Sequence, residues 1–289
     1  MKTNLQNAKS WLFVPANKPE FLAKAASRDA NVIIVDMEDA VPAADKEATR
    51  LVLNQRLADI KNSGQKLVLR TNTEIEQLVA DLSAIDINNI DGLMLPKLES
   101  ADYLNTVGEY LGRLELTQGK ALGSTAVVGL IESPKAILAA ADIALASERL
   151  ACLAIGSEDL ALSLGVIPTE HNLSAAISQV ILAAKNAGVG LLAVSGSLAQ
   201  FRDLVAYEQQ VISAASQGCT GALCIHPAQV SIVNQHYGPT PAQLAWANNV
   251  LLVVAAKPQA GVWQVDGAMV DAPVVARAKA LLEISEGNQ

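Results

Sequence analysis

Eight strand-like runs of apolar residues recur along the chain, and each is followed by a stretch long enough for a helix. They fall at residues 11–15, 32–38, 66–72, 92–97, 126–132, 150–156, 190–195 and 221–227. Successive runs begin roughly 20 to 40 residues apart, the length of a strand and its crossover helix. The runs are continuously apolar rather than alternating, which is typical of strands buried on both faces. The pattern therefore predicts a parallel sheet covered by helices.

Prolines and glycines mark the expected helix boundaries between these runs. Pro19, Pro42 and Pro134 stand where helices should begin, in keeping with the preference of proline for the first helical turn. Gly64 and Gly188 stand where helices should end. Eight strand–helix units indicate an α/β fold, a (β/α)8 TIM-type barrel over residues 1–238. A doubly wound sheet is the alternative, but no GxGxxG motif follows the first strand.

The pattern changes after the eighth run. Pro239 and Pro241 precede a helix predicted over residues 242–256, and a short hairpin is expected around Asp266-Gly267. A final helix is predicted over residues 274–285. Residues 239–289 are therefore expected to form a C-terminal helical and hairpin extension outside the barrel. We expect this extension to serve as a lid and as a contact between subunits.

Composition narrows the possible partners. The chain has 289 residues, 51% hydrophobic and 17% charged, which is enough for one large core. A net charge of −8 argues against nucleic-acid and anionic-membrane surfaces. No apolar run is long enough to span a membrane, and the first residues lack the apolar stretch of a signal peptide. Cys152, Cys219 and Cys224 form no CxxC pair, so we expect a reducing, cytoplasmic location.

Polar side chains gather where the predicted strands end. Glu132 and Asp159 each follow an apolar run and precede a helical pattern. The carboxyl ends of barrel strands face the active site, so these side chains should converge there. Carboxylates without a Cys/His cluster favour Mg²⁺ or Mn²⁺ over zinc. The full set at strand ends is Asp36, Glu38, Asp39, Arg70, Asn72, Lys97, Glu132, Glu158, Asp159 and His226.

Structural explanations compete at several of these positions. Asp159 could serve only as a cap for the following helix, since acids at strand ends often do so. For Asp39, a helix cap or a loop contact is the favoured interpretation. Arg70 fits a structural ion pair as well as a substrate contact. His226 precedes a proline, which favours a structural role over that of a base, and Lys97 carries no clear assignment.

Eight motifs stand in order along the chain: SWLFVPANKPEFLAKA, VDMEDAVPAADKEATR, LRTN, LMLPKLES, GLIESPKAI, GSEDLALSLG, CIHPAQV and DGAMVDAP. Together they resemble the citrate lyase beta-subunit/malyl-CoA lyase family, from about residue 10 to residue 275. The resemblance implies a TIM-like barrel that assembles as a homotrimer or a multiple of it. It also implies Mg²⁺-dependent cleavage of a carbon–carbon bond in a 3-hydroxyacyl thioester, usually of coenzyme A. The products would be an acyl-CoA and a 2-keto acid.

The resemblance also implies roles for individual residues. Glu132 in LIESP and Asp159 in GSEDL would be the metal ligands. Arg70 in LRTN would hold the substrate carboxylate and the developing oxyanion. Asp36 and Glu38 would line the same mouth as catalytic residues.

Two further roles follow from the resemblance. Asp271, in the C-terminal DGxMxD motif, would come from a neighbouring subunit to act as acid or base. Pro96, in LMLPK, would contact the substrate together with Arg70 and Glu132.

The chain departs from the family pattern at three positions. Lys9 stands where family members commonly have arginine, and Ala16 replaces the glycine of a PGN sequence. These positions lie near the CoA-binding region of relatives, so the carrier, CoA or an acyl carrier protein, stays open. Ser195 stands where many relatives carry an aspartate after the seventh strand.

The expected activity is therefore cleavage of citryl-CoA or citramalyl-CoA to acetyl-CoA and oxaloacetate or pyruvate. Malyl-CoA lyase or malyl-CoA thioesterase activity is the alternative within the enzyme class. A non-catalytic binding or assembly subunit on a barrel scaffold is the alternative from another class, because fold alone permits it.

Overall fold

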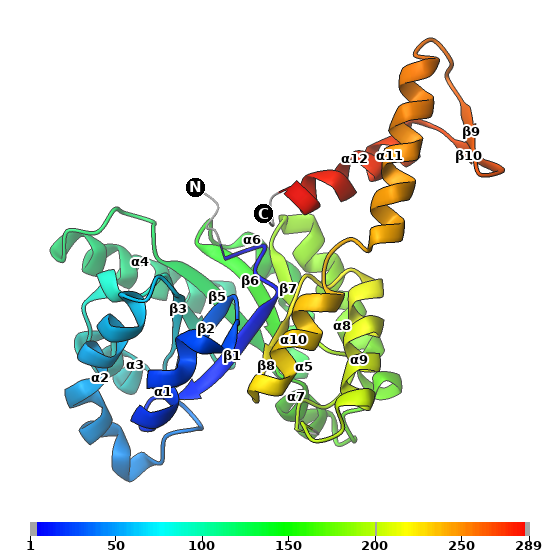
Figure 1. Cartoon of the computed structure of the whole chain (residues 1–289). Coiled ribbons are helices and arrows are strands. Elements are labelled where there is room, and N and C mark those ends of the chain that lie inside the picture. The colour runs from blue at the N-terminus through cyan, green and yellow to red at the C-terminus, as the bar shows by residue number, and fades with distance from the viewer. Residues whose placement is uncertain (1–4, 200, 287–289) are drawn as a thin grey trace. The chain divides into compact units, whose positions relative to one another are not determined.

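The computed structural model describes residues 5–199 and 201–286, and its first unit, Met1–Gln235, contains an eight-stranded parallel sheet (Figure 1). The strands are β1 (Ser10–Pro15), β2 (Val32–Asp36), β3 (Lys66–Arg70), β4 (Gly92–Leu95), β5 (Ala126–Ile131), β6 (Leu150–Ile155), β7 (Gly190–Leu192) and β8 (Ala222–Cys224). Every residue of β2, β4, β5 and β6 is buried. This burial explains why their sequences are apolar without alternation.

The sheet closes on itself as a barrel. Strand order is β7-β6-β5-β4-β3-β2-β1-β8, and all of these neighbours pair in parallel. An isolated parallel bridge joins Leu192 to Gly221, where Ala193 N donates to Gly221 O at 2.9 Å. A side chain at Gly221 would collide with the carbonyl oxygens of Ala8 and Lys9, so glycine is required at this seam. The predicted (β/α)8 barrel is confirmed.

Helices fill the connections between strands and surround them (Figure 1). They are α1 (Pro19–Ala25), α2 (Lys46–Lys61), α3 (Ile75–Ser83), α4 (Ala101–Thr117), α5 (Pro134–Leu138), α6 (Ala140–Leu145), α7 (Ser157–Leu164), α8 (Glu170–Ala187), α9 (Leu204–Gln217) and α10 (Pro227–His236), with 3-10 turns η1 (Ala26–Arg28), η2 (Ala43–Asp45) and η3 (Ile87–Asn89). Pro19 and Pro134 open α1 and α5, as expected. Pro42 instead precedes η2, which leads into α2. Gly188 ends α8 at φ 65°.

A second compact unit, His236–Gln289, follows the barrel. It consists of α11 (Pro241–Ala256), an antiparallel hairpin of β9 (Trp263–Val265) and β10 (Ala268–Val270), and α12 (Ala272–Glu286). Thr240 begins α11 with a capping box in which Gln243 reciprocates. The hairpin turns at Asp266 and Gly267, whose φ values of 52° and 78° suit a type I′ turn.

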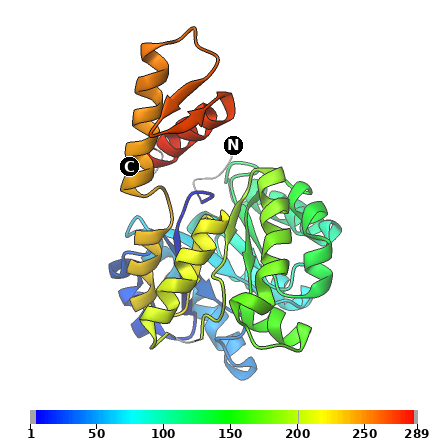
Figure 2. The same cartoon turned by 90° about the vertical axis from the view of Figure 1, so that its right-hand side faces the viewer.

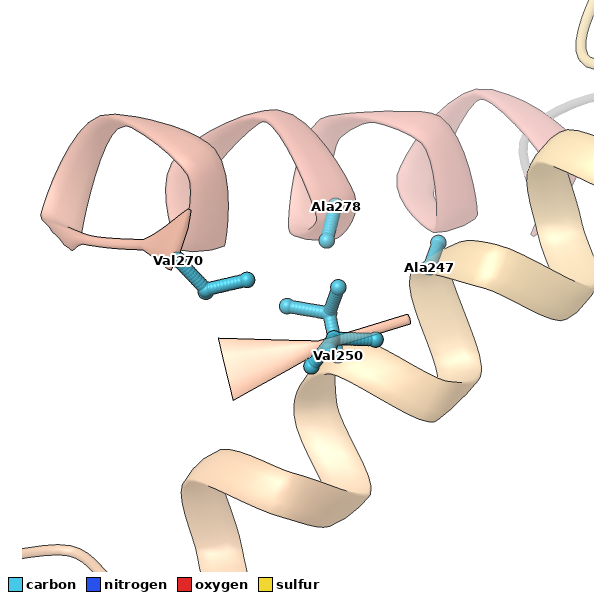
Figure 3. Packing of buried hydrophobic residues seen from close by; sticks show 5 residues of the cluster. Ala247, Val250, Val270 and Ala278 are labelled. Carbon is cyan, nitrogen blue, oxygen red and sulfur yellow. The ribbon is translucent and has the colours of Figure 1, made fainter. Parts of the chain in front are cut away.

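The second unit has its own small core. Helices α11 and α12 lie side by side, with the hairpin against α11 (Figure 2). Ala247 and Val250 of α11 meet Val270 and Ala278 at the centre of this packing, and Val265 completes the buried cluster (Figure 3). Small and β-branched side chains at these positions let the two helices and the hairpin approach closely. Among the described residues, no helix combines the length and apolarity needed to cross a membrane.

Candidate active site

A cavity of about 430 Å³ opens at the carboxyl ends of the barrel strands. It collects side chains from segments far apart in the sequence because parallel strands all end at the same edge. Of the residues expected at strand ends, the cavity is lined by Asp36, Asp39, Arg70, Glu132, Glu158 and Asp159. Apolar side chains, including Phe13 of β1 and Leu130 of β5, also line the cavity.

Asp36 and Arg70 form the most extensive ion pair of the cavity. They are register partners at the ends of β2 and β3, so their side chains leave the sheet together. Arg70 Nε and Nη2 donate to Asp36 Oδ1 and Oδ2 at 2.7 and 2.6 Å, a bidentate pairing. The guanidinium also lies 4.9 Å from the centre of the Phe13 ring. Burial alone would lower the Arg70 pKa, but Asp36 and its acidic neighbours outweigh this and raise it.

Glu38 connects this pair to two other segments. Its carboxylate lies 2.9 Å from Arg70 Nη1 and accepts a hydrogen bond from Thr73 Oγ1 at 2.9 Å. Lys97 Nζ lies 3.5 Å from Glu38 Oε1. Burial raises the pKa of Glu38, and Arg70 offsets part of that rise. Glu38 therefore supports Arg70 from beside the cavity rather than lining it.

Glu132 follows β5 directly and is buried, with 6% of its surface exposed. Its Oε2 accepts a hydrogen bond from the Lys97 backbone N–H at 2.8 Å. Gly156, at the end of β6, leaves the room that the carboxylate occupies, because a Cβ there would collide with Glu132 Oε1. Burial, together with the nearby charges of Asp159 and Glu38, raises the pKa of Glu132 to about 7, although the hydrogen bond from Lys97 N offsets part of the rise.

Asp159 lies in the first turn of α7, which begins just after β6. The residue at the N-cap is Gly156, and no side chain of the described residues caps this helix. The structure therefore does not use Asp159 as a side-chain cap. Its carboxylate instead lines the same cavity as Glu132.

The donor set fits a hard divalent cation. Glu132 is a buried carboxylate with Asp159 and Glu38 as acidic neighbours, and such a cluster is stabilised by a cation of high charge. In the described part of the chain, no group of three or more His, Cys, Asp or Glu side chains is placed to hold a metal by itself. Two carboxylates with room for water and substrate oxygens are the usual protein contribution to a Mg²⁺ site.

Other residues expected near the site have contacts of their own. Asn72 N and Nδ2 donate to the buried carboxylate of Asp81 at 2.9 and 2.8 Å, which fixes the start of the loop after β3. The His226 ring stacks on Phe201 with centroids 5.0 Å apart, and neither residue lines the cavity. Ser195 is buried and accepts a hydrogen bond from Gln217. These contacts agree with structural roles.

Like Glu38, two further residues predicted for the site, Pro96 and Asp271, are not among the residues that line the cavity. Pro96 is buried in the turn after β4. Asp271 belongs to the second unit, where it precedes α12. Its Oδ1 accepts a hydrogen bond from Val274 N at 3.3 Å, and its carbonyl oxygen accepts one from Val275 N at 3.0 Å.

Sequence reasoning missed three contributors to the site. Phe13 packs under the Arg70 guanidinium, Thr73 binds Glu38, and Gly156 makes space for Glu132. The glycine directly before the SED sequence was a usable signal, since a glycine at a strand end often marks a close approach. No local pattern points to Thr73, because its partner lies 35 residues away in the sequence.

The fold and the cavity define a class of protein. A (β/α)8 barrel whose strand ends bring carboxylates and an arginine into one cavity has the architecture of a barrel enzyme. Residues 9–227 match the HpcH/HpaI aldolase/citrate lyase family. The chain therefore belongs to this family, and it is an enzyme of the citrate lyase beta-subunit-like group of lyases.

Relatives and solved structures agree with this assignment. The chain is 28% identical to the citrate lyase subunit beta of Leuconostoc mesenteroides subsp. cremoris over 97% of this chain and 94% of that protein. It is 30% identical to a (3S)-malyl-CoA thioesterase of Cereibacter sphaeroides over 96% and 94%. It is also similar to the CitE protein of Mycobacterium tuberculosis, solved in complex with magnesium, acetoacetate and coenzyme A. That match has a TM-score of 0.74 and 30% identity over 98% of this chain and 100% of the other.

Proposed function

We propose that this protein is a Mg²⁺-dependent carbon–carbon lyase that cleaves a 3-hydroxyacyl-CoA, citryl-CoA or citramalyl-CoA, to acetyl-CoA and a 2-keto acid. The observation that carries the proposal is the cavity in which Glu132 and Asp159 lie with the Asp36–Arg70 pair. Similarity to the magnesium- and coenzyme A-bound CitE protein supports both the cation and the carrier.

Glu132 and Asp159 are the residues that would hold the cation, with Mn²⁺ as a possible substitute for Mg²⁺. Bound there, the cation would act as a Lewis acid toward the hydroxyl, keto and carboxylate oxygens of the substrate. Glu132 enters the site with Oε2 already bound by the Lys97 amide, so its other oxygen is the one available to the ligand. Asp159 can change rotamer more freely, because it is partly exposed at the start of α7.

Arg70 is suited to binding an anionic substrate group. Its guanidinium donates two hydrogen bonds to Asp36 and forms ion pairs with Glu38 at 2.9 Å and Asp39 at 3.8 Å. The guanidinium also lines the cavity, where it can meet a substrate carboxylate or the oxygen that gains charge as the bond breaks. A donor held in place before the reaction loses little orientation entropy when it binds that charge. Asp36 and Glu38 therefore act in the proposal by orienting Arg70.

The cleavage itself is a retro-Claisen-type step. A base removes the proton of the 3-hydroxyl, the carbon–carbon bond breaks, and its electron pair moves onto the thioester as an enolate. The hydroxyl-bearing carbon becomes the carbonyl of the keto acid, and protonation of the enolate carbon gives acetyl-CoA. In this proposal the proton carrier is Asp271 from a neighbouring subunit of a homotrimer or a multiple of it. The substrate contact expected of Pro96 and the cytoplasmic location stay predictions.

Thioester hydrolysis is a second candidate because one relative is a (3S)-malyl-CoA thioesterase. In that reaction water attacks the thioester carbonyl and the CoA thiol leaves, so the carbon skeleton of the acid stays intact. The same cavity could bind malyl-CoA for either reaction. The two activities differ in their products, which makes them separable.

The test is a panel of citryl-CoA, citramalyl-CoA and malyl-CoA with Mg²⁺, scored separately for keto acid and for free thiol. We expect keto acid without free thiol from citryl-CoA or citramalyl-CoA, and loss of the product when EDTA is added. Free thiol without keto acid would instead identify a thioesterase. Absence of both products from all three thioesters would contradict an acyl-CoA enzyme and favour a non-catalytic subunit.

A further inference from the structure

Lys97 has an unusual backbone conformation for a lysine. It follows Pro96 at the carboxyl end of β4 and has φ 49°, in the left-handed region. A proline followed by a residue of positive φ is the pattern of a type II turn, whose third position favours glycine or asparagine. Side chains other than these are strained there, and such strain persists where surrounding contacts fix it.

Hydrogen bonds donated by two consecutive backbone amides fix this turn. Lys97 N donates to Glu132 Oε2 at 2.8 Å, and Leu98 N donates to Leu130 O at 3.0 Å. In an extended chain, neighbouring N–H groups point to opposite sides of the strand. The positive φ of Lys97 lets both amides address the end of β5. A substituted residue at position 97 that avoids positive φ could keep only one of these two hydrogen bonds.

The side chain of Lys97 faces the same acidic cluster. Its ammonium lies 3.5 Å from Glu38 Oε1, while the side chain keeps 49% of its surface exposed. Glu38 in turn lies 2.9 Å from Arg70 Nη1. The backbone of Lys97 thus orients one carboxylate of the cavity and its side chain contacts another.

We propose that Lys97 is a positioning residue of the cation site. Its left-handed backbone holds Oε2 of Glu132, so that Oε1 is presented to a divalent cation at a fixed position beside Gly156. Hydrogen bonds of this kind, one step removed from the metal, orient ligands and strengthen binding. The inference rests on the proposed function in one respect, the binding of a divalent cation by Glu132 and Asp159.

A pair of variants separates the backbone from the side chain. Lys97→Gly and Lys97→Val both remove the ammonium, but glycine accepts positive φ and β-branched valine does not. The readout is the Kd for Mn²⁺ measured by calorimetry or electron paramagnetic resonance without substrate. We expect Lys97→Gly to stay within about fivefold of the unmodified protein, since the ammonium is half exposed. Lys97→Val should bind Mn²⁺ about 10- to 100-fold more weakly.

Asp29 provides a matched control because it also has positive φ, 55°, and lies exposed at the end of η1. Asp29→Val should carry a similar backbone cost without changing the Kd for Mn²⁺. Equal Kd values for Lys97→Val and Lys97→Gly would overturn the proposal. If Lys97→Val does not fold, Lys97→Ala replaces it. A Kd for Lys97→Ala equal to that of Lys97→Gly would likewise overturn the proposal. Failure of the unmodified protein to bind Mn²⁺ would instead overturn the cation site itself.

Discussion

The side chains of the cavity show how much of the site depends on single residues. Asp36 and Arg70 end neighbouring strands in register, and their bidentate bond fixes the guanidinium before any ligand arrives. The sequence placed both residues at strand ends, but it left Arg70 undecided between an ion pair and a substrate contact. The structure shows the ion pairs of Arg70 with Asp36 and Glu38, and it also places the Arg70 side chain in the cavity lining. The two interpretations are therefore compatible.

Gly156 offers a prediction at this scale. A Cβ at Gly156 would collide with the Glu132 carboxylate. The Glu132 side chain is too buried to move aside without losing its hydrogen bond from Lys97 N. We therefore expect Gly156→Ala to weaken Mn²⁺ binding by about 10- to 100-fold. Isothermal titration with Mn²⁺ measures the effect. Gly156 has φ −86°, so backbone strain does not contribute.

Gly108 supplies the control for this substitution. It lies within α4, where a Cβ would meet its nearest neighbour at 3.6 Å, an ordinary contact. Gly108→Ala should leave Mn²⁺ affinity unchanged, because alanine is also favoured within a helix. If Gly156→Ala binds Mn²⁺ as well as Gly108→Ala does, Glu132 does not need the space that Gly156 provides.

Among the elements, α4 is tied to the opposite end of the barrel by one buried carboxylate. Glu115 accepts hydrogen bonds from Gly123 N and Thr125 N, both at 2.7 Å, and from both Nη atoms of Arg149 at 2.9 and 2.8 Å. These partners precede β5 and β6, away from the strand ends that form the cavity. Burial alone would raise the Glu115 pKa, but these four bonds outweigh it and lower the pKa to about 2.

This shift predicts a stability difference that depends on pH. The folded pKa of about 2 lies below the ordinary value of 4.5, so the contribution of Glu115 is fully present above pH 4.5. It is lost as the pH falls from 4.5 through 2. Glu115→Gln should lower the free energy of unfolding at pH 7 by about 3 kcal/mol, from about 1.4 kcal/mol per pKa unit. Urea unfolding at pH 7 and at pH 3 measures it, and the difference should shrink at pH 3.

Glu109 is the control on the same helix, because it is exposed. Glu109→Gln should change the free energy of unfolding by less than about 0.5 kcal/mol at either pH. A loss in Glu115→Gln that is equal at pH 7 and pH 3 would mean that its cause is packing rather than the ionised carboxylate.

At the scale of the whole molecule, the chain divides into a barrel unit and a second unit with its own small core. Asp271 belongs to the second unit, whereas Arg70 belongs to the barrel. The proposed reaction uses both residues and takes them from different subunits. That requirement gives the assembly a role in catalysis, which mixing of subunits can test.

We expect Asp271→Asn and Arg70→Lys each to lower kcat, by about 10²–10⁴-fold for loss of an acid–base group and about 10²–10³-fold for loss of an oriented donor. Equal mixing of the two variants, with subunit exchange, should restore up to about a quarter of the native rate, because one shared site in four then has both native residues. The measurement is activity against time after mixing. If mass spectrometry shows that the subunits have exchanged but no activity returns, Asp271 does not act across an interface.

The sequence by itself determined the barrel, because eight buried parallel strands require eight continuous apolar runs and helices between them. It also located the hairpin, since Asp266-Gly267 can adopt the two positive φ values that the turn needs. The sequence pattern predicted seventh and eighth strands that are longer than β7 and β8 in the structure. Ala193 N donates across the barrel seam, but the next residues leave the ladder, with Ser195 N donating to Gln210 O in α9. Apolar composition does not reveal where backbone pairing stops.

Only the tertiary structure decided how the individual acidic side chains at the strand ends are oriented. Glu132 is oriented by an amide from the β4 turn and by the absence of a side chain at Gly156, and Glu38 is held by Thr73 and Arg70. Each of these contacts joins residues more than 20 positions apart, so no local pattern encodes it. The physical reason is that barrel closure, not chain proximity, brings the strand ends together.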